Sequence, residues 1–408
     1  MSDERPRLRA IEAFPMEHEG REMVVLRDPA GYTEAVLMLP MGVVGIVALF
    51  DGSRSLVEVQ AEIMREHAEL VPRSQLEQMV ATLDEHGFMD SARFAERRAA
   101  IDGEFLNGPL RAAAHAGGAY AADPHELRAA MDAFFTAPQG PGAAAAPASG
   151  APPIRAIIAP HIDFHRGGPA YAWAYRDLIE RADADTFVIF GTCHAGMKHP
   201  FALTRKDYDT PFGPARVDRD LVEKLAGRAR QDCFGSELAH RSEHSIEFQA
   251  VFLQYLYAGR RDIRIVPVLA SFAHEVLARR QGPADDPRVS AFLDALAETL
   301  AASGRSTAVI AGADLAHVGP RFGDPEPVSP AERARIERED RAMLAAVEAG
   351  DAGGFFASVA ADGDRRRICG LSPIYALLRT VAGTPGTLRH YGQSDDPQGV
   401  VSYASVVF

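Results

Sequence analysis

Imidazole and carboxylate side chains follow short apolar runs at three widely separated places in this sequence. His161 follows the first run, His194 follows the second, and Asp314 and His317 follow the fourth. If these runs are parallel strands, their carboxyl ends meet at one edge of a sheet, which is where open α/β folds bind ligands. A single histidine at a strand end is usually a packing or surface residue. Three strand ends that carry the same chemistry predict one shared site.

Two further residues fit such a site. His244 falls in the first turn of an expected helix with Ser242 as its N-cap, where the positive end of the helix dipole favours a neutral, proton-accepting imidazole. Cys369 precedes Gly370 and another expected helix, whose free amides favour a thiolate. Each has a plainer alternative, because His244 also suits a capping or packing role and Cys369 also suits a buried apolar position.

Neutral imidazoles and a thiolate together suit a transition metal such as iron, copper or zinc. Three protein ligands leave coordination positions open, as a catalytic metal site needs. The Cys-x-x-Cys spacing that is typical of a closed structural zinc site is absent from the sequence. We therefore expect a metal site that the fold assembles from distant parts of the chain.

The apolar runs also indicate the fold that positions these residues. They are short and apolar on both faces, as in a buried, largely parallel sheet covered by helices. A helical stripe with i, i+3, i+4, i+7, i+8 spacing begins at Phe248, and residues 400–408 are expected to form one more strand. The predicted fold class is α/β, with strands at residues 154–159, 186–191, 263–270 and 306–313.

Residues 1–100 have a different pattern and are expected to form a small α+β domain of their own. Ser55 and Glu58 make a capping box at the start of one helix. The order helix, Asp-Gly turn, helix resembles a PqqD-type winged-helix domain, a module that holds peptides for modifying enzymes. A DNA-binding winged helix or a structural appendage would share this pattern. The expected strands and helices lie at residues 23–29, 35–40, 43–50, 55–67 and 74–86.

Composition narrows the class of protein. The chain has 408 residues, which is room for two or three domains, and we expect the second at 108–408 with a Pro/Gly/Ala-rich loop at 136–153. Lys and Arg number 43 against 56 Asp and Glu, a net charge of -13, which argues against nucleic acid or anionic lipid as a partner. Three cysteines and no apolar N-terminal run predict a cytoplasmic protein without a signal peptide, and no apolar stretch is long enough to span a membrane.

Seven motifs in order resemble the Memo family, which in bacteria is also named AmmeMemoRadiSam system protein B. The resemblance covers residues 111–408 and places the 1–100 unit outside the family core. The motifs are RAAAHAGGAYAADPHEL, RAIIAPHIDFHRGG, IFGTCH, SEHSIE, GADLAHVGPRF, ICGLSPI and YGQSDDPQGVVSYAS.

The resemblance implies a fold similar to class III extradiol dioxygenases, whose non-haem iron site opens at one end of an α/β sheet. It implies metal ligation by His161, His194 and Cys369, with a thiolate where the dioxygenases use a carboxylate. Ring cleavage is then less expected than a copper- or iron-dependent redox role. The remaining family positions are Asp314, His317 and His244.

The sequence departs from the family pattern next to the first expected ligand. Many Memo sequences have PHAGY where this chain has Pro160-His161-Ile162-Asp163-Phe164. The Asp163 carboxylate is expected within reach of the metal, as a further ligand or as a hydrogen-bond partner of a ligating histidine. Oxygen ligation would shift the metal preference towards harder ions. His165 and Cys193 are extra candidates as well.

Three functional hypotheses follow. The first is a metal-dependent redox enzyme, with iron or copper on the three ligands, and His244, His317 and Asp314 handling protons or orienting substrate. In this hypothesis the N-terminal domain brings a peptide or protein partner, such as one handled by a radical SAM enzyme. The second is a non-catalytic metal-binding or peptide-binding adaptor. The third is metal-assisted hydrolysis, which predicts zinc.

Overall fold

The computed structural model describes residues 5–68, 70–143, 153–396 and 398–408. The chain divides into two compact units, Met1–Asn107 and Gly108–Phe408, and each is described by itself. Part of the loop expected at 136–153 lies outside the described residues. No helix in the described ranges is long and apolar enough to cross a membrane.

The N-terminal unit combines a three-stranded antiparallel sheet with helices. The sheet order is β1-β2-β3, and one face of it packs Val24, Leu26 and Leu39 onto the hydrophobic core of the unit. The capping box expected at Ser55 and Glu58 is confirmed at the start of α2. The elements are β1 (Glu12–His18), β2 (Arg21–Arg27), β3 (Leu37–Pro40), α1 (Met41–Ala48), α2 (Leu56–His67), α3 (Arg73–Glu85) and α4 (Ala92–Asn107).

The C-terminal unit is built on an eight-stranded sheet with the order β11-β13-β5-β10-β6-β9-β7, in which β12 pairs with β13. The four central strands β5, β10, β6 and β9 run parallel, and antiparallel strands complete both edges. Two short strands, β4 and β8, pair separately. The strands are β4 (Leu110–Arg111), β5 (Ala156–Ala159), β6 (Thr186–Thr192), β7 (Phe201–Leu203), β8 (Asp207–Tyr208), β9 (Arg264–Ala270), β10 (Thr307–Gly312), β11 (Asp314–Val318), β12 (Thr387–Gln393) and β13 (Val400–Val407).

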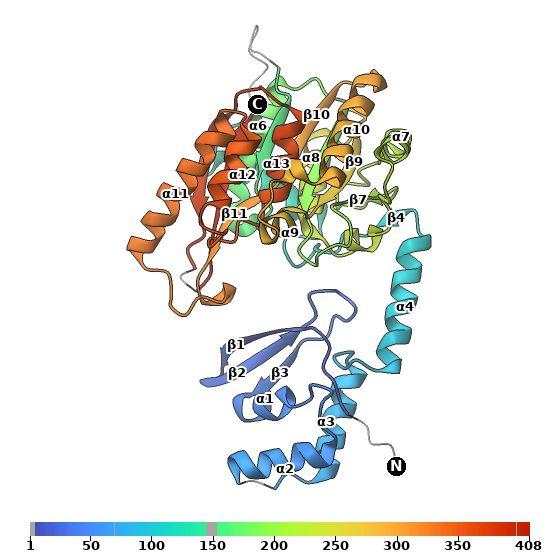
Figure 1. The fold of residues 1–408 in the computed structure, drawn as a ribbon, viewed down its shortest axis with the longest axis vertical. Coiled ribbons are helices and arrows are strands. Elements are labelled where there is room, and N and C mark those ends of the chain that lie inside the picture. Colours follow the sequence, from blue (N-terminus) through green and yellow to red (C-terminus); the bar gives the residue numbers. More distant parts are fainter. Residues whose placement is uncertain (1–4, 69, 144–152, 397) are drawn as a thin grey trace. The chain divides into compact units, whose positions relative to one another are not determined.

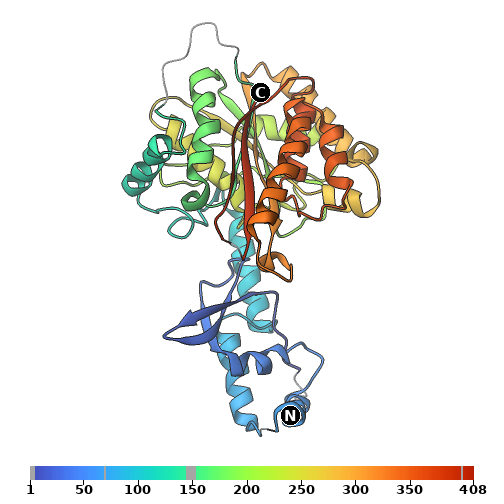
Figure 2. The same ribbon diagram turned by 90° about the vertical axis from the view of Figure 1, so that its left-hand side faces the viewer.

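Helices cover both faces of this sheet. On one face α6 and α8 lie against the strands, with α5 packed on α6, and on the other face α13 lies against the strands with α10 and α12 packed on it. Figure 1 shows α13 in front of the sheet, and Figure 2 shows α6 on one side of the sheet with the orange C-terminal helices on the other. The α-helices are α5 (Pro124–Thr136), α6 (Phe164–Arg181), α7 (Arg219–Ala229), α8 (His244–Tyr257), α9 (Ala273–Ala278), α10 (Pro287–Ser303), α11 (Pro330–Glu348), α12 (Ala352–Ala360) and α13 (Leu371–Thr380), and the 3-10 turns are Glu237–His240, Pro283–Asp285 and Pro320–Phe322.

The expected α/β fold with a central sheet flanked by helices is confirmed, and three details differ. Asp314 to His317 was expected to follow a strand, but it belongs to a strand of its own, β11, which pairs with β13. The stripe that starts at Phe248 covers only part of the buried surface of α8, which is buried on all sides from Ser245 to Tyr257. Ser242 does not cap this helix, because the cap is the side chain of Glu243.

Candidate metal centre

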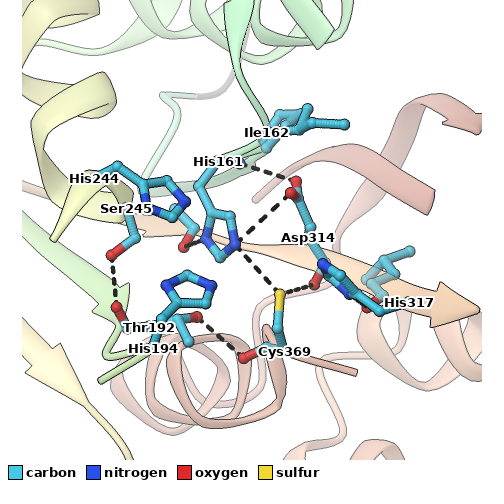
Figure 3. Close-up of polar contacts among 12 residues, drawn as sticks. His161, Ile162, Thr192, His194, His244, Ser245, Asp314, His317 and Cys369 are labelled. Atoms are coloured by element: carbon cyan, nitrogen blue, oxygen red, sulfur yellow. Dashed lines mark hydrogen bonds and ion pairs between the residues drawn. The ribbon is translucent and has the colours of Figure 1, made fainter. Parts of the chain in front are cut away.

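The structure brings the three expected metal ligands together at the carboxyl edge of the parallel strands. His161 lies two residues beyond β5, His194 lies two residues beyond β6, and Cys369 lies two residues before α13. One ligand atom from each of the three residues lies within 4.8 Å of the other two. Figure 3 shows the two imidazoles and the sulfur facing a common centre. Residues 208 positions apart therefore converge on a cluster that could hold one metal ion.

The orientation of His161 is fixed by a backbone carbonyl. Its Nδ1 lies 2.9 Å from the carbonyl oxygen of Gly312, so Nδ1 must carry the hydrogen and donate it. Nε2 is then free, and it lies 3.3 Å from the Cys369 sulfur. The ring is almost fully buried, and burial lowers the pKa of His161 to about 3, with the charge of His194 adding to the effect. His161 is therefore a neutral imidazole whose Nε2 lone pair points at the Cys369 sulfur.

His194 is oriented by a carboxylate that the sequence analysis did not single out. Its Nδ1 lies 3.0 and 3.1 Å from the two carboxylate oxygens of Glu243, whose side chain is 5% exposed. Burial alone would raise the pKa of Glu243, but the charges of His194 and His244 and hydrogen bonds from His194 hold it well below its usual range. Burial would lower the pKa of His194, but Glu243 raises it. The signal in the sequence was a glutamate directly before an expected helix, within the SEHSIE motif.

The expectation that the helix amides favour a Cys369 thiolate is wrong. Burial, followed by the charge of Asp314, raises the pKa of the Cys369 thiol well above its ordinary value. The sulfur lies 3.7 Å from the Asp314 carbonyl oxygen, to which the thiol donates. Metal binding to this cysteine must therefore displace a proton, because the thiolate is the ligating form.

Asp314 and His317 lie beside the cluster. The Asp314 carboxylate accepts a hydrogen bond from the His161 backbone N–H at 2.9 Å, and its other oxygen lies 3.7 Å from His161 Nε2. Burial raises the pKa of Asp314 to about 6 and lowers the pKa of His317 to about 4. His317 donates from Nδ1 to the Leu315 carbonyl at 3.1 Å and is not among the converging ligand atoms of the described residues.

His244 lies on the other side of the cluster. Its ring stacks on His194 with centroids 4.6 Å apart and meets His161 edge-on at 5.2 Å. Burial lowers the pKa of His244 well below its ordinary value, so the predicted neutral form is supported, although burial and not the helix dipole is the leading cause. The ring centroids of His115 and His244 lie 5.6 Å apart. His115 belongs to the RAAAHAGGAYAADPHEL motif, and no role was predicted for it.

The three extra candidates do not join the cluster. Arg166 engages the Asp163 carboxylate through both Nε and Nη2, and the largely exposed His165 lies 3.1 Å from the same carboxylate. The buried Cys193 thiol donates to the carbonyl oxygen of Gly196. The expectation that Asp163 reaches the metal is therefore wrong, because an arginine one turn along α6 holds its side chain.

Close approach of the backbone holds the cluster together. A Cβ on Gly191 would lie 2.5 Å from the Ser245 hydroxyl, so only glycine lets the start of α8 pack this closely on the end of β6. Ser245 donates its hydroxyl to the Thr192 carbonyl at 2.7 Å, and Thr192 donates its own hydroxyl to the Cys369 carbonyl at 3.0 Å. These two bonds connect α8, β6 and the loop that carries the sulfur.

A buried ion pair holds the start of α8 in place. The Arg111 and Glu247 side chains form a salt bridge with no solvent exposure. Arg111 also donates from Nη2 to the Glu243 carbonyl at 2.7 Å, and Glu247 accepts the Tyr120 hydroxyl. The pKa of Tyr120 is raised, by burial first and by the Glu247 charge second, so this hydroxyl stays a donor. The residues around position 111 are therefore part of the architecture of the site.

Comparisons with known proteins identify the family of this chain. A family model described as Memo-like protein matches residues 111–407. A MEMO1 family protein from Aquifex aeolicus is 27% identical over 403 residues, covering 98% of this chain and 99% of its own length. One from Methanopyrus kandleri is 29% identical over 309 residues, covering 73% and 98%. The solved structure of an Escherichia coli K12 protein matches 62% of this chain and 99% of its own chain, at 14% identity and a TM-score of 0.37. The match to the family model over most of the chain shows that this protein belongs to the Memo family.

Proposed function

We propose that this protein binds a transition metal through His161, His194 and Cys369 and functions as a metal-dependent redox protein. The observation that carries the proposal is the convergence of two imidazoles and one thiol within 4.8 Å at a strand edge. Two oriented imidazoles and a sulfur that face one point have the geometry of a cation site, and the Cys369 thiol would lose its proton when a cation binds. The donor set fits the metal that the family resemblance implies.

The donor chemistry favours iron or copper. A thiolate with two imidazoles is a soft to borderline set, which suits copper, iron and zinc better than magnesium or calcium. Iron or copper would supply electron transfer or oxygen activation at this position, whereas zinc would supply Lewis-acid chemistry and support the hydrolytic alternative. The engagement of Asp163 by Arg166 removes the oxygen ligand that would have favoured a harder ion.

The surrounding residues are suited to proton handling. Asp314 has a pKa of about 6, raised by burial, so it can hold a proton on the oxygen that faces His161 and release it near neutral pH. His244 and His317 are neutral, and each has one ring nitrogen that can accept a proton. We propose that these three residues orient the substrate and exchange protons with it.

We propose that the site occupies a dioxygenase-like position in the sheet without catalysing ring cleavage. The proposed ligands His161 and His194 follow β5 and β6, which supports the proposed similarity to class III extradiol dioxygenases. The third donor is a sulfur, which differs from the carboxylate of that class. We therefore propose redox chemistry on a substrate that is not a catechol ring.

Oxygen consumption tests this proposal. Protein loaded anaerobically with iron(II) or copper(I) and supplied with ascorbate as electron donor is expected to consume oxygen. The His194→Ala variant should lose this activity, while His165→Ala should keep it because His165 is 70% exposed and outside the cluster. Tight metal binding without oxygen uptake would favour the non-catalytic metal-binding adaptor. Zinc-dependent hydrolysis that ignores oxygen would favour the third hypothesis.

We also propose that the N-terminal unit binds a peptide or protein partner, for example one that a radical SAM enzyme modifies, as a PqqD-like winged-helix domain would. Phe14, Met16 and Met38 are exposed on its sheet, and the strand register puts them on the same face. Sedimentation of the full chain with a candidate radical SAM enzyme should show a complex that Phe14→Ser with Met38→Ser weakens. Equal binding by this variant would contradict a role for that face.

We propose a cytoplasmic location, because three cysteines in 408 residues do not provide a disulfide framework.

A further inference from the structure

Glu243 lies at the centre of the hydrogen bonds around the candidate metal ligands. Its Oε2 accepts the backbone N–H of His194 at 2.8 Å, and its Oε1 accepts the backbone N–H of Ser245 at 3.0 Å. His194 Nδ1 contacts both oxygens, and His244 Nδ1 lies 3.3 Å from Oε1. One buried side chain therefore joins the end of β6, the start of α8 and two imidazole rings.

We propose that Glu243 is a positioning residue of the metal centre, which makes His194 present Nε2 to the metal. The inference rests on the proposed metal site. A carboxylate only accepts hydrogen bonds, so the His194 nitrogen that faces it carries the hydrogen and the other nitrogen is left free. His161 is held in the same way by the carbonyl of Gly312. Both histidines therefore direct Nε2 towards the proposed metal. Nδ1 of His161 donates to a neutral carbonyl, and Nδ1 of His194 donates to a charged carboxylate.

The charged acceptor matters because His194 is the more exposed of the two ligands. Its side chain is 38% exposed, whereas the side chain of His161 is 2% exposed. Burial and the Gly312 carbonyl hold the His161 ring, whereas the more exposed His194 ring depends on Glu243 to fix its orientation. A carboxylate partner also increases the electron density that a ligating imidazole donates, and removing such a partner typically weakens metal affinity about 10- to 100-fold.

The competing interpretation makes Glu243 a direct ligand. Ligand atoms of His194, Glu243 and His244 also converge within 4.8 Å, and in this interpretation they hold a second cation. The hydrogen bonds favour the positioning role, because each Glu243 oxygen already accepts a backbone N–H. A cation between these residues would also have to displace the hydrogen on His194 Nδ1. The number of metal ions bound per chain distinguishes the two roles.

Cobalt(II) binding by the full chain tests the proposal, with Glu243→Gln as the variant. We expect wild type to bind one cobalt ion with a thiolate charge-transfer band, and Glu243→Gln to bind one ion about 10- to 100-fold more weakly with the band retained. Asp218→Asn is the matched control, because Asp218 is a buried N-cap carboxylate of α7 that pairs with Arg305 and not with a histidine. Its cobalt affinity should equal that of wild type.

A double-mutant cycle tests whether Glu243 acts through His194. In a His194→Ala background, Glu243→Gln should change cobalt affinity less than about 2-fold, since its target is gone. Long-range proton–nitrogen spectra of the metal-free protein at pH 9 give a second readout, in which His194 should carry its hydrogen on Nδ1 in wild type and on a mixture of both nitrogens in Glu243→Gln.

Several results would overturn the proposal. These are unchanged cobalt affinity in Glu243→Gln, equal weakening with and without His194, a His194 tautomer that does not respond, or two ions in wild type that fall to one in Glu243→Gln. Failure of wild type to bind cobalt is a different outcome, because it contradicts the proposed metal site itself.

Discussion

The buried salt bridge between Arg111 and Glu247 lies beside the candidate metal centre, and its contribution to the free energy of unfolding can be predicted. Replacing Arg111 with Met keeps most of the apolar stem and removes the charge. The Glu247 carboxylate is then left without a cation in a position with no solvent exposure. Breaking a buried pair by removing one partner costs about 3–5 kcal/mol. The Tyr120 hydroxyl and the His115 backbone N–H still donate to Glu247, so we expect a loss of about 3 kcal/mol, at the lower end of that range.

Urea unfolding of the C-terminal unit measures this loss. Lys224→Met is the control, because Lys224 and Asp220 form an ion pair whose side chains are 54% and 65% exposed, and such pairs contribute at most about 1 kcal/mol. A double variant of Arg111→Met with Glu247→Gln should lose less stability than the sum of the two single variants, since the second change removes the unpaired charge. If Arg111→Met costs no more than Lys224→Met, the buried pair does not hold the start of α8, and the reasoning is refuted.

Two further predictions concern stability. Burial lowers the pKa of His240 to about 3, whereas the same histidine in the unfolded chain has a pKa of about 6.5. Between these two values only the unfolded chain binds the proton, so the free energy of unfolding falls as the pH drops from about 6.5 towards 3. The expected loss at pH 5.5 is about 1.4 kcal/mol. Urea midpoints at pH 7.5 and 5.5 should differ less in His240→Gln, and an equal difference would contradict this. Gly191→Ala should cost about 1–3 kcal/mol because its Cβ would meet the Ser245 hydroxyl, whereas Gly227→Ala in α7, with open space at its Cβ, should stabilise by about 0.5–1 kcal/mol. Thermal unfolding checks both, and equal shifts would show that the close approach at Gly191 is not constrained.

The parallel core of the fold could be predicted because its strands are apolar on both faces. That pattern is local, and all four expected runs appear as the neighbouring strands β5, β10, β6 and β9. The edge strands were harder to predict. The edge strand β7 has three residues, which leaves no periodicity to read, and the edge strand β11 follows β10 after the single residue Ala313.

The convergence of His161, His194 and Cys369 could be predicted from strand ends and motifs, but the residues that orient them could not. Glu243 and Arg111 are charged, and a charged residue is normally expected at the surface. Their burial depends on partners that are distant in sequence, such as Glu247 for Arg111, 136 positions away. The role of Asp163 was predicted wrongly for the same reason, because its position next to His161 in sequence does not show that Arg166 engages it.

Metal content of the purified protein tests the central claim most directly. Wild type, His161→Ala, Cys369→Ser and Cys193→Ser are purified anaerobically and measured by elemental analysis. Cys193 is a matched control because it is a buried free cysteine outside the cluster. We predict about one iron or copper ion per chain in wild type and in Cys193→Ser, and a large loss in the other two variants. Equal metal content in all four proteins would contradict the assignment of these residues as ligands.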